Sequence, residues 1–170
     1  MKQTGVTRKI DELGRIVIPK EIRKNLGIRD GEALEIFTSE DSIILKKYFE
    51  VRKYEDLSSK LCELIKNIYN VDLVITDREK VITSSNKDIV ENTKLNNKFL
   101  DLIDNREMFI SREILTINLG IDISGYFTVI PIIASSDSLG LVIIISDNAN
   151  DYSSLGKLLA KIIADKIDIF

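Results

Sequence analysis

The beginning of the chain limits the fold more than any other part of the sequence. Residues 6–10 and 15–18 are rich in β-branched side chains and predict two short strands. Gly14 between them can take the positive φ of a turn. Pro19 suits the first position of a helix, and Gly27 suits its end. The order strand, turn, strand, short helix is therefore expected over residues 5–27.

A second strand pair is predicted directly after this segment, at residues 34–38 and 43–48. About 50 residues arranged in this way cannot bury many apolar side chains by themselves. Yet the four strands carry many Ile, Val, Leu and Phe side chains. Partner strands from a second copy of the chain are the simplest way to cover them, so a dimer is expected.

The charge is distributed unevenly along the chain. Residues 1–53 hold twelve Lys and Arg against nine Asp and Glu, a net charge of +3. Residues 54–170 hold twelve basic and eighteen acidic residues, a net charge of −6. A basic front half on an acidic protein is typical of a module that binds a polyanion, although an ordinary solvated face would also account for +3.

A dozen positions of the basic half match a known family in order and spacing. They fall within residues 4–5, 8–19, 21–23 and 26–28, with a similar trailing segment at residues 44–48. The pattern resembles the AbrB-type swapped-hairpin DNA-binding domain over residues 1–52. The resemblance implies an intertwined dimer, a swapped-hairpin β-barrel in which two hairpins interleave and basic side chains reach double-stranded DNA.

The same resemblance places five basic residues at the DNA-contacting positions of that family: Arg8, Lys9, Arg15, Arg23 and Lys24. Lys and Arg neutralise phosphates and release counterions, so affinity is expected to fall as salt rises. The guanidinium of Arg can also donate two hydrogen bonds to one guanine edge, which Lys cannot do. The alternative for each residue is a solvated cation or a salt bridge to Asp11, Glu12 or Glu21.

Residues 53–170 are predicted to form a separate domain of α+β class. Residues 49–53 are a short charged connector without Gly or Pro, and apolar side chains at helical spacing follow it at residues 57–68. Strands are expected at residues 71–76, 81–84, 114–119, 126–133 and 139–146, and helices around residues 95–103 and 155–167, with a smaller helical piece near Ile89 and a loop at residues 120–125. The surplus of apolar residues in the last helix suggests helix-to-helix association between chains.

This layout resembles a GAF-type sensor domain, chiefly through residues 129–133 and 139–143. Joined to an AbrB-type front end, the whole arrangement is similar to a family of sporulation transcription factors. That resemblance implies a regulator that is active in the developing spore and assembles as a dimer of dimers, a tetramer. No ligand can be identified: residues 97–101 lack the spacing of a cyclic-nucleotide motif, and polar residues near strand ends (Ser84, Ser85, Ser111 and Arg112) line either a pocket or the surface.

Catalysis is not expected, because the chain has no histidine and a single cysteine. Cys62 flanks an apolar helix stripe and is expected to be a small buried hydrophobe rather than a reactive thiol. One cysteine excludes an internal disulfide, and no apolar run reaches the roughly 18 residues that span a bilayer, so a cytoplasmic protein without membrane contact is expected. Neither a cofactor nor a metal site is predicted.

Two functions of different classes compete. The first is a sequence-selective DNA-binding transcription regulator, an activator or a repressor, whose second domain spaces the DNA-binding modules or responds to an unidentified small molecule. The second is an antitoxin of the AbrB or MazE kind that binds DNA and a partner toxin. Such antitoxins carry a flexible tail, whereas residues 54–170 are patterned throughout like a folded domain.

Overall fold

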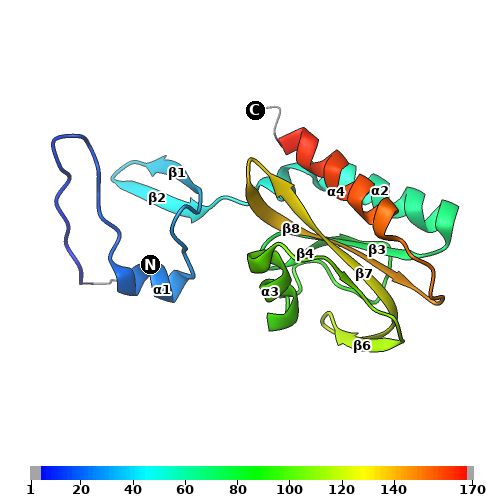
Figure 1. Cartoon of the computed structure of the whole chain (residues 1–170). Helices are drawn as coiled ribbons and strands as arrows, with labels where there is room; N and C mark the ends of the chain where they lie inside the picture. The colour runs from blue at the N-terminus through cyan, green and yellow to red at the C-terminus, as the bar shows by residue number, and fades with distance from the viewer. Residues whose placement is uncertain (1–4, 168–170) are drawn as a thin grey trace. The chain divides into compact units, whose positions relative to one another are not determined.

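The structure, a computed structural model, describes residues 5–167. The chain divides into two compact units, an N-terminal unit (Met1–Tyr48) and a C-terminal unit (Phe49–Phe170) (Figure 1). The domain boundary expected from the sequence, between residues 52 and 53, lies four residues after this division between Tyr48 and Phe49. Thr4, which contributed to the family resemblance, lies outside the described residues.

The N-terminal unit contains one short helix and one β-hairpin. Helix α1 (Lys20–Leu26) follows Pro19, whose missing N–H is no loss at a helix start, and ends at Gly27 with φ 63°. Strands β1 (Leu34–Ser39) and β2 (Ser42–Lys47) are antiparallel and in continuous register. The predicted helix and the second predicted strand pair are therefore confirmed.

The first predicted strand pair is wrong for the single chain. Residues 5–18 form no strand, and only the turn between the two segments is present. The N–H of Asp11 donates to the carbonyl oxygen of Arg15 and the N–H of Gly14 donates to the carbonyl oxygen of Asp11, both at 3.0 Å. Strand propensity needs a ladder partner to become a strand, and within one chain these segments meet only at their turn.

A six-stranded antiparallel sheet forms the centre of the C-terminal unit (Figure 1). The strand order is β4-β3-β8-β7-β5, and β6 pairs with the first residues of β7. The strands are β3 (Asp72–Thr76), β4 (Val81–Ser84), β5 (Phe109–Ile110), β6 (Leu115–Asn118), β7 (Asp122–Ala134) and β8 (Asp137–Ser146).

Helices cover both faces of this sheet. The helical segments are η1 (Glu50–Tyr54, a 3-10 helix), α2 (Glu55–Tyr69), α3 (Asn97–Asn105) and α4 (Ser153–Ile167). Helices α2 and α4 pack on one face, α2 over β3 and β4 and α4 over β7 and β8, whereas α3 packs against β8 in the other core cluster (Figure 1). The predicted connector thus forms a helical turn that leads directly into α2.

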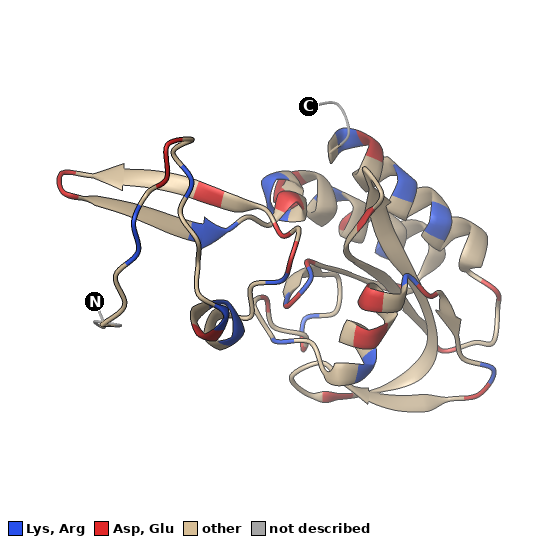
Figure 2. Ribbon diagram, turned by 60° about the vertical axis from the view of Figure 1, so that its left-hand side comes forward, with Lys and Arg blue, Asp and Glu red and all other residues tan. Residues whose placement is uncertain are grey.

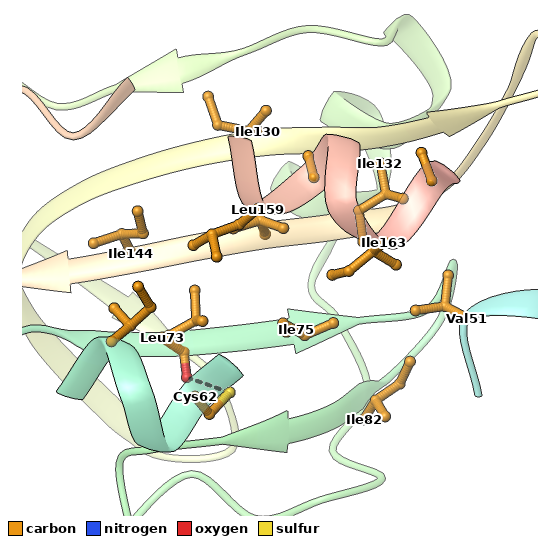
Figure 3. Close-up of a cluster of buried hydrophobic side chains, with 14 of the residues drawn as sticks. Val51, Cys62, Leu73, Ile75, Ile82, Ile130, Ile132, Ile144, Leu159 and Ile163 are labelled. Carbon is orange, nitrogen blue, oxygen red and sulfur yellow. Dashed lines mark hydrogen bonds between the residues drawn. The ribbon is translucent and has the colours of Figure 1, made fainter. Parts of the chain in front are cut away.

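Two hydrophobic cores result, one on each face of the sheet. In β8, Val142 and Ile144 belong to the core under α2 and α4, and Ile143 and Ile145 belong to the core under α3. Successive side chains of a strand point to opposite faces, so a strand buried on both sides needs the continuous apolar run seen here. Figure 3 shows the first core, with Ile144 and Leu73 projecting toward Leu159 of α4.

Cys62 lies inside this first core, 2% exposed, and its thiol donates to the carbonyl oxygen of Leu73 at 3.4 Å (Figure 3). Burial raises the pKa of the Cys62 thiol to about 12. The expectation of a buried cysteine is confirmed.

Four details of the C-terminal unit differ from the sequence prediction. The segment near Ile89 forms turns instead of a helical piece, and β5 was not predicted. The expected loop at residues 120–125 is largely strand, because β6 supplies a partner for the beginning of β7. The hairpin between β7 and β8 is tighter than expected, with Ser135 at φ 48° and Ser136 at φ 69°.

In the described part of the chain, no helix is long and apolar enough to cross a membrane.

Candidate nucleic-acid interface

Three of the five predicted DNA-contacting residues lie within residues 5–18, two irregular arms joined by a turn, which we call the N-terminal hairpin although it contains no strand. Arg8 and Lys9 are exposed on its first arm, and the guanidinium of Arg8 donates to the carbonyl oxygen of Thr7 at 2.9 Å. Arg15 follows the turn and is also exposed, with 72% of its side chain accessible. These three cations lie on the exposed surface on either side of one turn.

The carboxylate of Asp11 organises that turn. Its Oδ1 accepts hydrogen bonds from the N–H groups of Leu13 (3.0 Å) and Arg15 (2.8 Å), and its Oδ2 accepts from Nε of Arg15 at 2.7 Å. The backbone N–H of Arg15, and then its side chain, hold the pKa of Asp11 below its ordinary value. Asp11 is therefore charged at neutral pH, and Arg15 starts from an ion pair.

The other two predicted residues, Arg23 and Lys24, lie in the last turn of α1. Cations are favoured there by the partial negative charge of the helix C-terminus. The guanidinium Nη1 of Arg23 forms an ion pair with Asp30, while its Nε is buried and has no hydrogen-bond partner among residues 5–167. Arg23 thus pairs with Asp30, not with Glu21 as the sequence alternative held.

The five cations form two groups, one on the hairpin and one on α1. Figure 2 shows basic residues on both segments. All five side chains are cations without acceptor atoms, so the two groups do not pair with each other.

Apolar side chains are exposed throughout the N-terminal unit. Between residues 5 and 48 no residue is buried, and α1 buries none of its side chains. Ile43 of β2 is 69% exposed and Val17 of the hairpin is 72% exposed. The full set of large exposed apolar residues is Val6, Ile10, Leu13, Ile16, Val17, Leu26, Ile36, Phe37, Ile43 and Leu45. A protein unit of this composition is not stable in water unless another surface covers it.

The C-terminal unit has a polar cavity of about 280 Å³ at the end of α2. Its lining includes the ion pair of Lys66 and Asp72, whose Nζ and Oδ1 atoms lie 2.8 Å apart. The lining residues are Lys66, Asn70, Asp72, Asn86, Asp88, Ile121, Asp122, Ile123, Ser124, Ile145, Ser146 and Asp147.

The polar residues that the sequence offered as pocket candidates do not line this cavity. Ser85 and Ser111 instead accept hydrogen bonds from backbone N–H groups, of Leu73 at 2.8 Å and Phe127 at 2.7 Å. Ser84 is half-buried and Arg112 is exposed. Phe99, at the centre of the segment compared with a cyclic-nucleotide motif, is fully buried in the core under α3.

No cluster of three or more His, Cys, Asp or Glu side chains in the part of the chain that the structure describes could hold a metal ion. Sequence reasoning missed one charged residue of structural interest, Arg52. It was counted with the basic N-terminal half, but its Nε lies 2.6 Å from Oδ2 of Asp77 in the C-terminal unit. The two residues are far apart in sequence, and no local pattern marks the pair.

The sequence matches two protein families, one for each part of the chain. Residues 7–52 match the family described as "Antidote-toxin recognition MazE, bacterial antitoxin". Residues 53–167 match the family described as "Stage V sporulation protein T C-terminal, transcription factor".

Individual relatives agree with this division. Over 153 residues the chain is 37% identical to "Stage V sporulation protein T" of Bacillus subtilis (strain 168), covering 86% of this chain and 85% of that protein. Over 48 residues it is 60% identical to "Transition state regulatory protein AbrB" of the same organism, covering 28% of this chain and 50% of that protein. Among solved structures, the solution structure of the N-domain of the transcription factor abrB is 60% identical and covers 28% of this chain and 92% of that chain, with a TM-score of 0.27.

Proposed function

Since this chain belongs to the stage V sporulation protein T family of transcription factors, we propose that it is a sequence-selective, DNA-binding regulator of sporulation genes. The premise rests on the family match over residues 53–167 and on the 37% identity to that protein over most of both chains. The 60% identity of the front segment to AbrB supports DNA binding by the N-terminal unit. Its place of action is the cytoplasm, where the DNA lies.

One observation carries the proposal furthest: the N-terminal unit buries none of its residues between 5 and 48. Its strand-forming segments at residues 6–10 and 15–18 have no ladder partners within the chain. A second copy would supply both the ladder partners and the apolar cover, because the same surface on each chain can be self-complementary about a two-fold axis. The proposed state is a swapped-hairpin β-barrel dimer.

Dimerisation would also concentrate positive charge. Each chain contributes Arg8, Lys9, Arg15, Arg23 and Lys24, so a dimer presents two copies of the hairpin group and two of the α1 group. Phosphate contacts by these cations give affinity, and bidentate contacts by the Arg side chains to guanine give sequence selectivity. Asp11 and Asp30 hold Arg15 and Arg23 in defined positions before DNA arrives.

The C-terminal unit, residues 53–170 in the proposed division of domains, is proposed to be a GAF-like domain that joins dimers into a tetramer. Helices α2 and α4 present exposed apolar side chains, including Leu64 (53% exposed), Ile68 (69%) and Leu158 (57%). Their association between chains would fix the distance between two DNA-binding modules. A small-molecule effector could act only by binding two such arrangements with different affinity.

A second candidate function is that of an antitoxin, because the family matched by residues 7–52 is described as an antitoxin family. The observation against it is the C-terminal unit, which has two hydrophobic cores and a six-stranded sheet instead of an extended tail. Limited proteolysis separates the two candidates. A C-terminal half that resists protease supports the regulator, and rapid destruction of that half supports the antitoxin.

Fluorescence anisotropy of labelled duplexes tests the proposal directly. The full chain should bind duplex DNA at low ionic strength, and the logarithm of its affinity should fall linearly with the logarithm of salt concentration, by roughly 0.9 per phosphate contact. Selected genomic fragments should bind more tightly than random duplexes of equal length. Absence of binding at low ionic strength would refute the proposed function.

A further inference from the structure

The helical turn η1 (Glu50–Tyr54) begins only two residues after the end of the N-terminal unit and is fixed to the C-terminal unit. Val51 is fully buried and belongs to the core under α2 and α4 (Figure 3). The hydroxyl of Tyr54 donates to the carbonyl oxygen of Lys166, near the end of α4, at 2.8 Å. The connector between the two units is therefore a docked segment rather than a free linker.

Arg52 makes the polar part of this attachment. Its Nε lies 2.6 Å from Oδ2 of Asp77, a residue with no exposed surface, and its Nη2 lies 3.3 Å from Oδ1 of Asn92. Asp77 stands in the turn between β3 and β4, and Asn92 stands in the segment that precedes α3. One side chain thus joins the connector to two separate segments of the C-terminal unit.

The Asp77 carboxylate does not need Arg52 to build its own turn. Its Oδ1 already accepts from the N–H groups of Glu79 (2.7 Å) and Lys80 (2.6 Å), which close the turn locally. The second oxygen, Oδ2, is the one that accepts from Arg52. A buried carboxylate with one oxygen used by its turn and the other aimed at the connector is a specific anchor for that connector.

From this geometry we propose that Arg52 is a positioning residue for DNA binding: through Asp77 it fixes the connector, and so fixes the point on the C-terminal unit from which the chain leads into each DNA-binding unit. The inference rests on the proposed function and deepens it. Val51 and Tyr54 supply apolar and backbone attachment, and Arg52 supplies the charged, orientation-dependent contact. Loss of the ion pair should leave both units folded. It should, however, free the connector from the C-terminal unit, so that the chain leading into the N-terminal unit no longer starts from a fixed point.

The substitution Asp77→Asn separates anchoring from folding. The amide keeps one oxygen for the two N–H groups of the turn and presents its NH₂ group to the guanidinium, which cannot accept from it. Asp72→Asn is the matched control, because Asp72 pairs with Lys66 in the same unit and lies outside the contacts of the connector. Arg52→Gln is the second variant, in case the turn itself does not tolerate Asp77→Asn.

Two measurements on the full chain decide the matter. Trypsin cleaves after Arg52 and Lys53, so the rate of cleavage there reports how often the connector leaves its dock. Asp77→Asn should raise that rate by roughly tenfold over wild type, and Asp72→Asn should not. With duplexes that carry two binding sites, wild type should prefer one spacing, Asp77→Asn should lose most of that preference, and both should bind a single site with equal affinity.

Equal rates of cleavage after Lys53, the bond that trypsin can cut in wild type, Asp77→Asn and Arg52→Gln alike, overturn the proposed anchor. Faster cleavage with an unchanged spacing preference overturns the positioning role of Arg52. If wild type binds no duplex, the proposed function fails and the positioning role fails with it, whereas the cleavage rates still decide whether the ion pair docks the connector. The two failures are thus distinguishable.

Discussion

The Nε atom of Arg15 lies 2.7 Å from Oδ2 of Asp11, four residues earlier on the same hairpin. Asp11 also accepts a hydrogen bond from the backbone N–H of Arg15, so it holds both the main chain and the side chain of that residue. An exposed ion pair of this kind contributes little to stability, but it limits the positions that the guanidinium samples. The Nη groups of Arg15 are therefore held in a restrained orientation, which suits the DNA contact proposed for them.

Arg15→Ala and Arg23→Ala should each weaken binding to a target duplex by about 1–3 kcal/mol, roughly fivefold to 150-fold. Each change removes a cation and a planar donor group from the proposed interface. Arg112→Ala is the control, since Arg112 is an exposed Arg of the C-terminal unit. Gel-shift titration measures the affinities, and size-exclusion chromatography with light scattering checks that the oligomeric state is unchanged. Affinity unaltered by both substitutions would remove Arg15 and Arg23 from the interface.

The pKa of Asp11 should depend on Arg15 in a defined way. The backbone N–H of Arg15 is the main cause of the lowered pKa and its side chain is the second, so Arg15→Ala should raise that pKa while leaving it below 3.8. Because the folded-state pKa is depressed, the contribution of Asp11 to the turn is present above 3.8 and is lost as the pH falls through the lowered value. Carboxyl-detected NMR titration of both proteins measures this; identical pKa values would contradict the ion pair.

Gly140→Ala should lower the free energy of unfolding of the C-terminal unit by about 3 kcal/mol or more. A Cβ at this position would lie 2.0 Å from the backbone oxygen of Thr76, so β3 and β8 would have to separate. Gly125→Ala on β7 is the matched comparison, because its Cβ would meet Ile145 Cγ2 at 3.0 Å and the oxygen of Ser146 at 3.1 Å. Urea unfolding should show a loss of only about 1 kcal/mol there. A smaller loss for Gly140 than for Gly125 would contradict the close strand approach.

Cys62 should react very slowly with iodoacetamide at pH 8 in the folded protein. Burial raises the pKa of this thiol to about 12, so the thiolate is scarce, and the side chain is closed to the reagent. In guanidinium chloride the same residue should react at the rate of an ordinary free cysteine. Mass spectrometry follows the modification, and equally fast labelling of native and unfolded protein would show that the core under α2 and α4 does not enclose Cys62.

Much of the C-terminal unit could be predicted from the sequence, because its pattern is repeated many times. The spacing of Leu57, Leu61 and Ile65 predicted α2, and the continuous apolar run of β8 predicted a strand. The start of β7 was missed, since the short stretch between Gly120 and Gly125 becomes strand only through pairing with β6. Local propensity cannot reveal a partner strand.

For the N-terminal unit, strand propensity predicted more strand than the single chain contains. The residues of the first hairpin have strand propensity, but the described chain offers them no ladder, so Ile16 and Val17 stay exposed and irregular. For the candidate interface, composition and family resemblance indicated which Lys and Arg residues would contact DNA, but they did not indicate the acidic residues with which these cations pair. Arg23 pairs with Asp30 across a turn, and Arg52 with Asp77 across the fold; neither pair follows from helical or strand spacing.

The most direct measurement is native mass spectrometry of the full chain mixed with a short duplex at increasing ionic strength. The account predicts complexes that hold two or four chains on each duplex and that dissociate from DNA as salt rises while the protein stays oligomeric. A single chain bound to a duplex, a monomeric protein at all concentrations, or no complex at low ionic strength would contradict it.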